Sequence, residues 1–310
     1  MRDIYIINPM AGKRDAALNF MERAKAWHAE HGGEYELHLT QRAGHGEELA
    51  RMYAESGEEL RLWVAGGDGT INEVVCGAAN HENVSVGIFP CGSGNDFVRS
   101  FGPKEIFLNF EKQNRGTTVT IDAIRSEHGG AVNICSIGFD AKVANEMTFY
   151  KGLPGETGES AYILSLAKCL TGKISDPMTV HLWNGKGEEE TYSGEFVFTL
   201  AANARWYGGG FLGAPKAVLN DGLLEFILIR SPALYRIPGL IRVYKSGKHL
   251  DSEKLKDIVI YARGTKIEIE SDRELISNMD GNCVKASHEC FSVMPGAIRL
   301  ILPEGVTLPQ

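Results

Sequence analysis

The order of apolar and polar positions along the chain falls into two parts with different rhythms. In the first part, short apolar runs alternate with segments in which apolar residues recur every three or four positions, as in an amphipathic helix. Strand alternating with helix predicts a parallel sheet with helices on both faces, which is a three-layer α/β domain. The predicted strands lie at 4–7, 34–40, 62–65 and 84–89, and the predicted helices at 17–27, 47–53 and 71–79.

The rhythm changes near Thr117, where strand-like segments become the rule. Helical pieces interrupt them near 141–147 and 161–170, and Asn184-Gly185 is a hairpin signal between two strands. This pattern predicts an all-β sandwich or barrel. The predicted strands lie at 119–124, 131–137, 178–183, 195–202, 223–229, 258–262 and 266–269.

A glycine-rich turn stands where the third strand meets its helix. The run Leu62–Ala65 continues directly into Gly66-Gly67-Asp68-Gly69-Thr70. Thr70 followed by Glu73 predicts a capping box that starts the helix. Glycines let the backbone turn sharply, and the first N–H groups of the helix then favour an anion such as phosphate. The alternative is a tight strand-to-helix turn without a ligand.

A second glycine loop, Pro90-Cys91-Gly92-Ser93-Gly94-Asn95-Asp96-Phe97, follows the fourth strand. Neither loop has the GxGxxG spacing of a dinucleotide fingerprint, and Ala11–Arg14 lacks the flanking residues of a P-loop. Loops that follow parallel strands lie at the same edge of the sheet. We therefore expect both glycine loops, with the loops after Ile7 and Leu39, to form one phosphate-binding crevice.

At 310 residues the chain is long enough for two domains, and its 43% hydrophobic and 23% charged residues are typical of a soluble globular protein. We place the boundary at Ile121–Asp122, which gives domains 1–122 and 123–310, with the last strand a candidate to return to the first domain. The formal net charge of −8 argues against a nucleic-acid partner.

The sequence also indicates a compartment. The N-terminus enters a strand-like run without a signal-peptide pattern, and no apolar run approaches the length of a transmembrane segment. The six cysteines are scattered and show no metal-ligand spacing. We expect a cytoplasmic protein with reduced thiols.

Short motifs rich in glycine, asparagine and aspartate recur over most of the chain: Asn8-Pro9-x-x-Gly12, Gly66-Gly67-Asp68-Gly69-Thr70-x-Asn72-Glu73, Pro90-x-Gly92-Ser93-Gly94-Asn95-Asp96-Phe97-x-Arg99, Gly138-Phe139-Asp140, Asn203 and Asn220-Asp221-Gly222-x-Leu224. Together they resemble the diacylglycerol kinase catalytic-domain family, in particular its bacterial soluble lipid kinases. The GGDGT segment is shared with NAD kinases and phosphofructokinases, whereas GSGNDF is typical of lipid kinases. A NAD kinase is therefore hard to reconcile with the second loop.

The resemblance implies an N-terminal α/β nucleotide domain and a C-terminal β-sandwich domain. It also implies transfer of the γ-phosphoryl group of ATP, with Mg2+, to a hydroxyl of diacylglycerol or a related lipid. Asp68 would be the carboxylate of the site, acting through magnesium or water. The nucleotide-binding residues implied are Asn8, Lys13, Thr40, Gly66, Gly67, Asp68, Gly69, Thr70, Asn72, Ser93 and Asn95.

The segment Asn220-Asp221-Gly222 resembles the structural magnesium loop of the family. The resemblance implies an ion held by the Asp221 carboxylate and by the backbone carbonyls of Val218 and Leu223. Oxygen ligands of this kind suit magnesium. The alternative is a turn that holds no metal.

One position departs from the family pattern. The family carries Asp-Gly-Glu near its C-terminus, with the Glu as the base that accepts the proton of the lipid hydroxyl, whereas this chain has Asp280-Gly281-Asn282. Asparagine cannot act as that base, so Asp280 is the natural substitute, and Glu289 is a more remote one. Two functions stay open at this point: a lipid kinase with Asp280 as base, or a catalytically impaired nucleotide- or lipid-binding protein on the same fold.

The segment 232–250 mixes basic and apolar residues. Such a segment either lies on an anionic bilayer or packs on its own domain with its basic residues in solvent. A lipid substrate requires access to a membrane surface, so peripheral contact with the inner face of the membrane is one expectation. The sequence leaves the acceptor lipid, the nucleotide preference and assembly into a homo-oligomer open.

Overall fold

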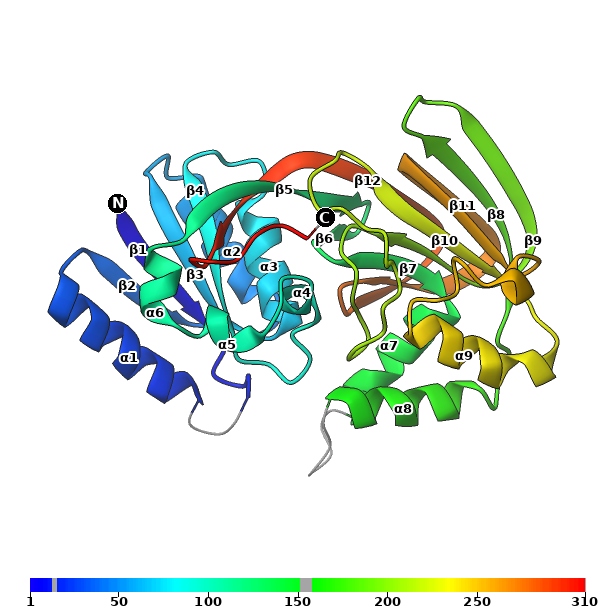
Figure 1. The fold of residues 1–310 in the computed structure, drawn as a ribbon, viewed down its shortest axis with the longest axis horizontal. Helices are drawn as coiled ribbons and strands as arrows, with labels where there is room; N and C mark the ends of the chain where they lie inside the picture. The colour runs from blue at the N-terminus through cyan, green and yellow to red at the C-terminus, as the bar shows by residue number, and fades with distance from the viewer. Residues whose placement is uncertain (13–15, 151–157, 310) are drawn as a thin grey trace. The chain divides into compact units, whose positions relative to one another are not determined.

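The computed structural model describes residues 1–12, 16–150 and 158–309, which form two compact units (Figure 1). Unit 1 comprises Met1–Ala123 and Pro295–Gln310, and unit 2 comprises Ile124–Met294. The two units divide between Ala123 and Ile124, and the last segment, Pro295–Gln310, belongs to unit 1. The domain bounds 1–122 and 123–310 stay a prediction.

The sheet of unit 1 is parallel. Its strand order is β4-β3-β1-β2, and the end of β12 adds to β4, also in parallel, through the pair Leu300 and Val86. The α/β prediction is therefore confirmed. The strands are β1 (Arg2–Ile7), β2 (Tyr35–Leu39), β3 (Leu60–Gly66), β4 (Val84–Pro90) and β12 (Asn282–Leu302).

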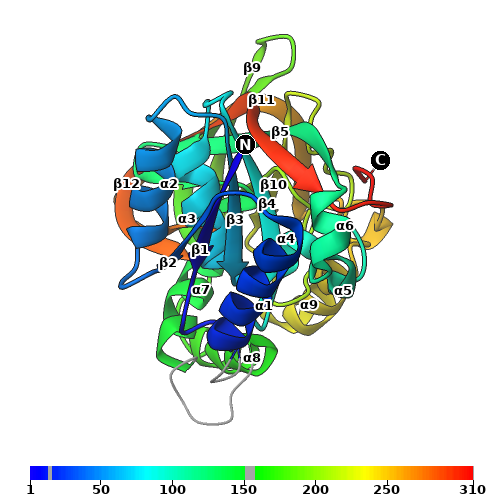
Figure 2. The same ribbon diagram turned by 90° about the vertical axis from the view of Figure 1, so that its left-hand side faces the viewer.

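Helices cover both faces of this sheet, as Figure 2 shows for α2 and α3 on one side and α1 on the other. Successive strand residues point to opposite faces. Tyr5 and Ile7 thus pack with Phe20 of α1 in one cluster, which also contains Phe110 of α6. The helices are α1 (Ala16–His31), α2 (His45–Ala54), α3 (Asp68–Ala78), α4 (Asp96–Arg99), α5 (Lys104–Phe107) and α6 (Phe110–Asn114).

The strands that pair within unit 2 are antiparallel, and the predicted sandwich is confirmed. The hairpin expected at Asn184 joins β8 to β9, and the Asn184 side chain accepts hydrogen bonds from the N–H groups of Lys186 and Glu188. The further strands are β5 (Thr117–Ser126), β6 (Gly129–Ala131), β7 (Ile134–Gly138), β8 (Asp176–Asn184), β9 (Glu189–Ala202), β10 (Leu224–Arg230) and β11 (Val259–Met279).

Two strands predicted at 258–262 and 266–269 are one long strand, β11. The glycine between them, Gly264, does not break the strand. A Cβ atom there would lie 2.0 Å from the backbone oxygen of Trp183 on β8. Glycine is required because the neighbouring backbone comes too close for a side chain.

Two apolar cores share the strands of unit 2. On β10, Phe226 and Leu228 belong to one core, and Ile227 and Ile229 to the other. Because both faces are covered, the strand has an unbroken apolar sequence instead of an alternating one. The second core is closed by α7 (Phe139–Tyr150), α8 (Gly158–Cys169) and α9 (Ile237–Lys245), together with Leu255 of η2 (Glu253–Leu255). The short helix η1 (Leu234–Arg236) precedes α9 in the chain.

Candidate functional site

The two glycine loops of unit 1 lie against each other. Gly66 ends β3 beside Pro90 at the end of β4, and its carbonyl accepts hydrogen bonds from the N–H groups of Cys91 at 2.8 Å and Gly92 at 3.2 Å. A Cβ atom on Gly92 would lie 2.5 Å from the Cα atom of Gly67. The loops can therefore approach this closely only because both positions are glycine.

Asp68 links the two loops. Its Oδ1 atom accepts a hydrogen bond from the backbone N–H of Phe97 at 3.2 Å. A Cβ atom on Gly94 would lie 2.9 Å from Asp68 Oδ2, so the carboxylate also lies against the second loop. The side chain is only partly buried. A carboxylate fixed at the C-terminal edge of a parallel sheet is in the region where such sheets bind ligands.

The loop after β1 also reaches this edge. Asn8 Nδ2 donates to Thr70 Oγ1 at 2.8 Å, and Asn8 Oδ1 accepts from the N–H of Met10 at 2.9 Å. Thr70 is buried, so Asn8 and Thr70 fix the path of the first turn of α3.

The predicted capping box is wrong. Helix α3 begins at Asp68, with Gly67 as its N-cap, and Gly67 has no side chain to cap the first turn. Thr70 instead accepts the bond from Asn8. The Glu73 carboxylate accepts hydrogen bonds from the N–H groups of Gly44 at 2.8 Å and Gly46 at 3.0 Å, at the start of α2. The N-cap of α3 therefore supplies no side-chain acceptor to the first turn, which suits an anionic ligand.

Asn95 shapes the second loop. It adopts a left-handed backbone conformation with φ of 54°, and its Nδ2 atom donates to the Gly92 carbonyl at 2.6 Å. Among the described residues, its buried Oδ1 atom has no hydrogen-bond partner. Arg99 brings a positive charge to this loop, because its guanidinium donates to the Gly94 carbonyl and lies 3.4 Å from Asp96.

The other predicted nucleotide residues differ in accessibility. Thr40 is partly exposed and donates its N–H to the Ile7 carbonyl at 2.9 Å. Ser93 is exposed on the second loop. Asn72 is buried on α3 and accepts a weak bond from the thiol of Cys76. Lys13 lies outside the described residues.

Asp280 has a defined place in unit 2. Asp280 and Gly281 form the two-residue turn between β11 and β12, with φ of 49° and 96°, as a tight hairpin requires. The carboxylate accepts three backbone hydrogen bonds, from Val132 at 2.9 Å, Asn133 at 2.8 Å and Ile134 at 2.8 Å. Asp280 thereby holds the segment that leads into β7, and accepting a proton would weaken those bonds.

Asn282, at the position of the family's base, is the first residue of β12 and is exposed. It pairs with Met279 across the turn. Glu289, the more remote candidate, is buried and accepts a hydrogen bond from Ser126 at 3.0 Å.

The predicted magnesium ligand Asp221 has protein partners for both oxygens. Oδ2 accepts from the guanidinium of Arg263, and Oδ1 accepts from the N–H of Leu223 at 3.1 Å. Arg263 is also bonded to the buried Glu225 at 2.7 Å. These contacts are those of a turn that holds no metal, because the guanidinium of Arg263 already balances the negative charge of the Asp221 carboxylate. The ligand set Val218, Asp221 and Leu223 stays a prediction.

Comparisons with known proteins identify the family. Residues 3–126 match the diacylglycerol kinase catalytic domain, and residues 133–302 match the YegS C-terminal NAD kinase beta sandwich-like domain. A Chromohalobacter salexigens protein named "Probable lipid kinase YegS-like" is 32% identical over 293 residues, which cover 90% of this chain and 87% of the relative. The chain belongs to the YegS-like lipid kinase family. A relative of the same name from Stenotrophomonas maltophilia is 30% identical over 89% of both chains.

Solved structures share the fold of this YegS-like chain. A structure titled as a diacylglycerol kinase from Bacillus anthracis str. Sterne aligns with a TM-score of 0.69 at 19% identity, over 99% of this chain and 98% of that chain. Another chain from the same organism gives a TM-score of 0.75 at 21% identity, over 98% and 97%. The two-domain architecture is thus that of the bacterial diacylglycerol kinase structures.

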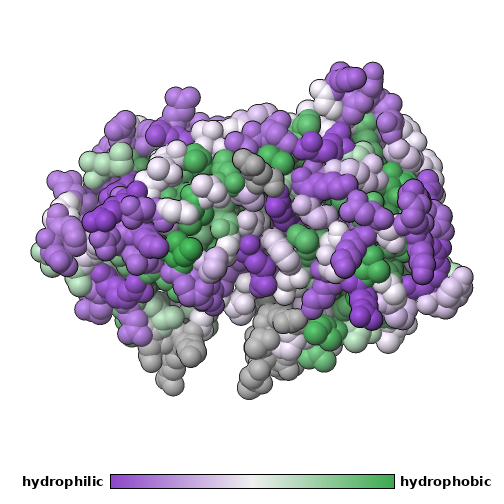
Figure 3. All heavy atoms as spheres, viewed as in Figure 1, coloured by the Kyte–Doolittle hydropathy of each residue, from purple (hydrophilic) through white to green (hydrophobic). Residues whose placement is uncertain are grey.

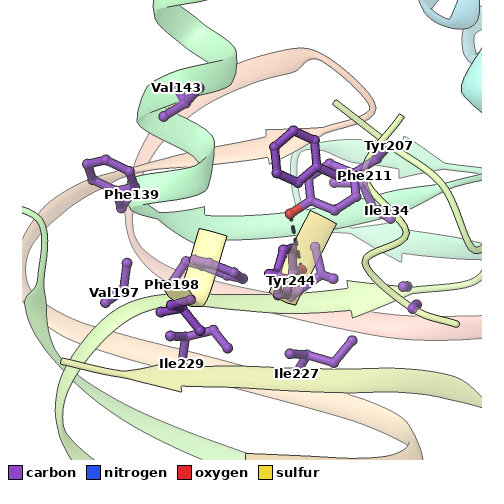
Figure 4. Close-up of a cluster of buried hydrophobic side chains, with 14 of the residues drawn as sticks. Ile134, Phe139, Val143, Val197, Phe198, Tyr207, Phe211, Ile227, Ile229 and Tyr244 are labelled. Atoms are coloured by element: carbon purple, nitrogen blue, oxygen red, sulfur yellow. Dashed lines mark hydrogen bonds between the residues drawn. The ribbon is translucent and has the colours of Figure 1, made fainter. Parts of the chain in front are cut away.

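Unit 2 of this YegS-like chain contains an apolar cavity of about 70 Å³. Its walls come from α7, α8, α9 and the strands β9 and β10, and Figure 4 shows part of this lining. Sequence reasoning missed the cavity, because it depends on residues from five separate elements. Val143 of α7, Tyr162 and Leu166 of α8, and Leu240 and Ile241 of α9 are among the lining residues.

One carboxyl group, Asp140, lies in the wall of this cavity. It is buried at the start of α7 and accepts a hydrogen bond from Ser136 Oγ at 2.9 Å. Burial raises the pKa of Asp140 to about 6, and hydrogen bonds from Ser136, Tyr207 and Tyr162 oppose that rise. The hydroxyl oxygens of Tyr207 and Tyr244 lie 3.1 Å apart, within hydrogen-bond distance (Figure 4). The Gly138-Phe139-Asp140 motif drew attention to Asp140 in the sequence, but it did not indicate that this side chain is buried.

The described residues also bring Glu268, Glu270 and His288 together on β11 and β12, with donor atoms within 4.8 Å of one another. Lys266 bonds to Glu268 at 2.7 Å and lowers the pKa of that carboxyl to about 2, with help from His288. A lysine and a histidine already neutralise this cluster, so we assign it no metal. None of the six cysteines forms a disulfide in the described chain.

Proposed function

We propose that this protein is an ATP- and Mg2+-dependent lipid kinase that transfers the γ-phosphoryl group to a hydroxyl of diacylglycerol or a related lipid. The observation that carries the proposal is the contact between the two glycine loops, with Asp68 bonded across it, in a chain of the YegS-like family.

The nucleotide is assigned to unit 1. The backbone N–H groups from Gly66 to Thr70 and the first turn of α3 would hold the phosphates, with Asn8 and Asn95 keeping the two loops in shape. Magnesium that accompanies ATP would neutralise phosphate charge, and a carboxylate such as Asp68 is the type of oxygen ligand that it prefers. Asp68 is partly exposed, which suits contact with a ligand.

The proposed transfer does not depend on a base at position 282. Phosphoryl transfer relies mainly on positioning and on neutralisation of charge, whereas a general base contributes roughly two to four orders of magnitude. The three backbone bonds of Asp280 weigh against its role as the substitute base and support a structural role. We therefore expect a slow kinase whose site is ordered by Asp68 and the glycine loops.

The cavity of unit 2 supports a lipid as the acceptor. Nearly all of its lining is apolar, which suits a hydrocarbon chain. Its volume of about 70 Å³ is well below the roughly 300–1,000 Å³ of ordinary ligand pockets. As it stands, the cavity therefore has room for only a short segment of one hydrocarbon chain, and we assign it to the end of such a chain.

The alternative, a nucleotide- or lipid-binding protein without turnover, is favoured by the exposed Asn282 at the position of the base. Both hypotheses predict ATP binding, so the test must follow the phosphoryl group. Purified protein is incubated with γ-labelled ATP, Mg2+ and a panel of hydroxy-lipids in mixed micelles. Label in the lipid phase that disappears on chelation of Mg2+ is the expected result. ATP binding without transfer to any lipid would contradict it, and transfer to NAD would indicate a NAD kinase.

A further inference from the structure

The outer surface of the helices that enclose the cavity carries exposed apolar side chains. On α8, Tyr162 and Leu166 face the cavity, while Ile163 and Leu164, on the other side of the helix, are exposed. Figure 3 shows green, hydrophobic surface in the region of α8. An exposed apolar patch can mark a site of interaction with a protein or a membrane.

The segment before α9 adds two more apolar side chains. Leu234 is 74% exposed and Tyr235 is 84% exposed, both in η1. Helix α9 itself packs inward, because Leu240 and Tyr244 are buried and Ile241 lines the cavity. Of the two hypotheses for segment 232–250, packing on its own domain therefore holds for α9. The exposed side chains of η1 do not pack in this way. Figure 1 shows α8 and α9 next to each other in unit 2, and both wall the same cavity.

The charge of this region is opposite to that of the whole protein. Between Ser231 and Leu250 the chain has four basic residues and no acidic one, although the formal net charge of the protein is −8. Asp257, from outside this segment, is paired with Arg236 at 2.6 Å. Arg242 and Lys248 are exposed, and within the described part of the chain they form no ion pair. Exposed basic groups next to apolar ones suit an anionic lipid surface.

We propose that the α8–η1 face, defined by Ile163, Leu164, Leu234 and Tyr235 with Arg242 and Lys248, docks on an anionic bilayer. The apolar side chains enter the interface between head groups and acyl chains, and the basic groups contact anionic head groups. The same helices wall the apolar cavity, so an acceptor that leaves the bilayer would have a short path for its hydrocarbon chain. The choice of a lipid bilayer as partner rests on the proposed lipid kinase function.

The experiment measures binding to vesicles without ATP, so that its result does not depend on catalysis. Vesicles of phosphatidylcholine, with and without phosphatidylglycerol at about 30 mol%, are sedimented with the full chain. The double variant Leu234→Glu/Tyr235→Glu should bind anionic vesicles at least about tenfold more weakly. The matched control is Leu18→Glu/Met52→Glu, which places the same charges at exposed apolar positions of unit 1 and should bind as the unchanged protein does.

A second pair of variants tests the charges. Arg242→Ala/Lys248→Ala should reduce binding to anionic vesicles and leave the weaker binding to phosphatidylcholine unchanged, and added salt should have the same effect. The proposal is overturned if the unchanged protein binds neither vesicle, or if the Leu234/Tyr235 variant binds as well as the control. Activity on a short-chain acceptor in micelles is measured separately. Vesicle binding without any such activity would contradict the proposed function and leave the docking face intact.

Discussion

The Asp68 carboxylate accepts a hydrogen bond from the backbone N–H of Phe97 at 3.2 Å, and this bond joins the two glycine loops of unit 1. It links the start of α3 to the start of α4, two places 29 residues apart in the chain. The carboxylate is thereby held at the edge of the sheet, while its partly exposed position leaves it accessible to a ligand.

The charge of Asp68 should matter more than this bond. Asp68→Asn keeps an oxygen that accepts the Phe97 N–H bond but removes the negative charge. We expect a loss of kcat for lipid phosphorylation of about a hundredfold or more, with a melting temperature close to that of the unchanged protein. Label transfer from ATP and thermal unfolding are the two measurements. Full activity in Asp68→Asn would show that the residue serves only to join the loops.

Two glycine variants separate the folding of the loops from their contact with nucleotide. In Gly92→Ala, the new Cβ atom would lie 2.5 Å from the Cα atom of Gly67, so we expect a loss of stability of about 1–3 kcal/mol by urea unfolding. At Gly69, a Cβ atom has no neighbour within 4 Å. Gly69→Ala should therefore keep its stability but bind ATP more weakly, as calorimetry would measure. Unchanged ATP affinity in Gly69→Ala would place the phosphates elsewhere.

Restoring a carboxylate at position 282 should increase the rate. Asn282 is exposed, so Asn282→Glu is tolerated without rearrangement of the core. We expect kcat to rise by about tenfold or more and to acquire an acidic limb in its pH profile. Asn282→Gln is the control, because it adds the same length without a base. Equal rates for the two variants would mean that proton transfer does not limit the reaction.

Two buried groups of unit 2 should give opposite pH dependences of stability. Burial raises the pKa of Asp140 from 3.8 to about 6, so the native state binds a proton more tightly and loses stability as pH rises from about 4 to 6. Burial lowers the pKa of His249 from 6.5 to about 4, so stability is lost as pH falls through the same range. Each shift changes the free energy of unfolding by roughly 3 kcal/mol.

Urea unfolding at several pH values measures this balance. In Asp140→Asn, the titration of Asp140 no longer opposes that of His249. The free energy of unfolding should therefore rise more steeply between pH 4 and 6 than in the unchanged protein. His249→Phe should do the reverse. Parallel profiles for all three proteins would contradict the assignment.

Filling the cavity should affect the lipid acceptor but not ATP. Val143 lines the cavity from α7, and Val143→Phe places a larger side chain in its volume of about 70 Å³. We expect a higher KM for long-chain acceptors, little change for short-chain ones and an unchanged KM for ATP. Steady-state kinetics with acceptors of graded chain length measures this. An equal increase for all chain lengths would place the hydrocarbon chain outside the cavity.

The positions of most strands and helices could be predicted from local patterns, because the alternation of apolar residues follows directly from the geometry of each element. The two glycine loops were found for a similar reason, since glycines at the ends of strands are visible in the sequence. The capping box failed because Thr70 and Glu73 each had a stronger partner in space, Asn8 and the N-terminus of α2. A local sequence motif contains no information about such partners, because they are distant in the sequence.

The sequence by itself determined the two-domain organisation, the order of the elements and the residues of both glycine loops, since each depends on neighbours within a few positions. Only the tertiary structure decided the partners of Asp280 and Asp221, the burial of Asp140 and the exposure of Leu234 and Tyr235. Those properties depend on which distant segments pack together. Packing depends on the apolar surface that all elements of a domain bury jointly, which no local segment of the sequence shows.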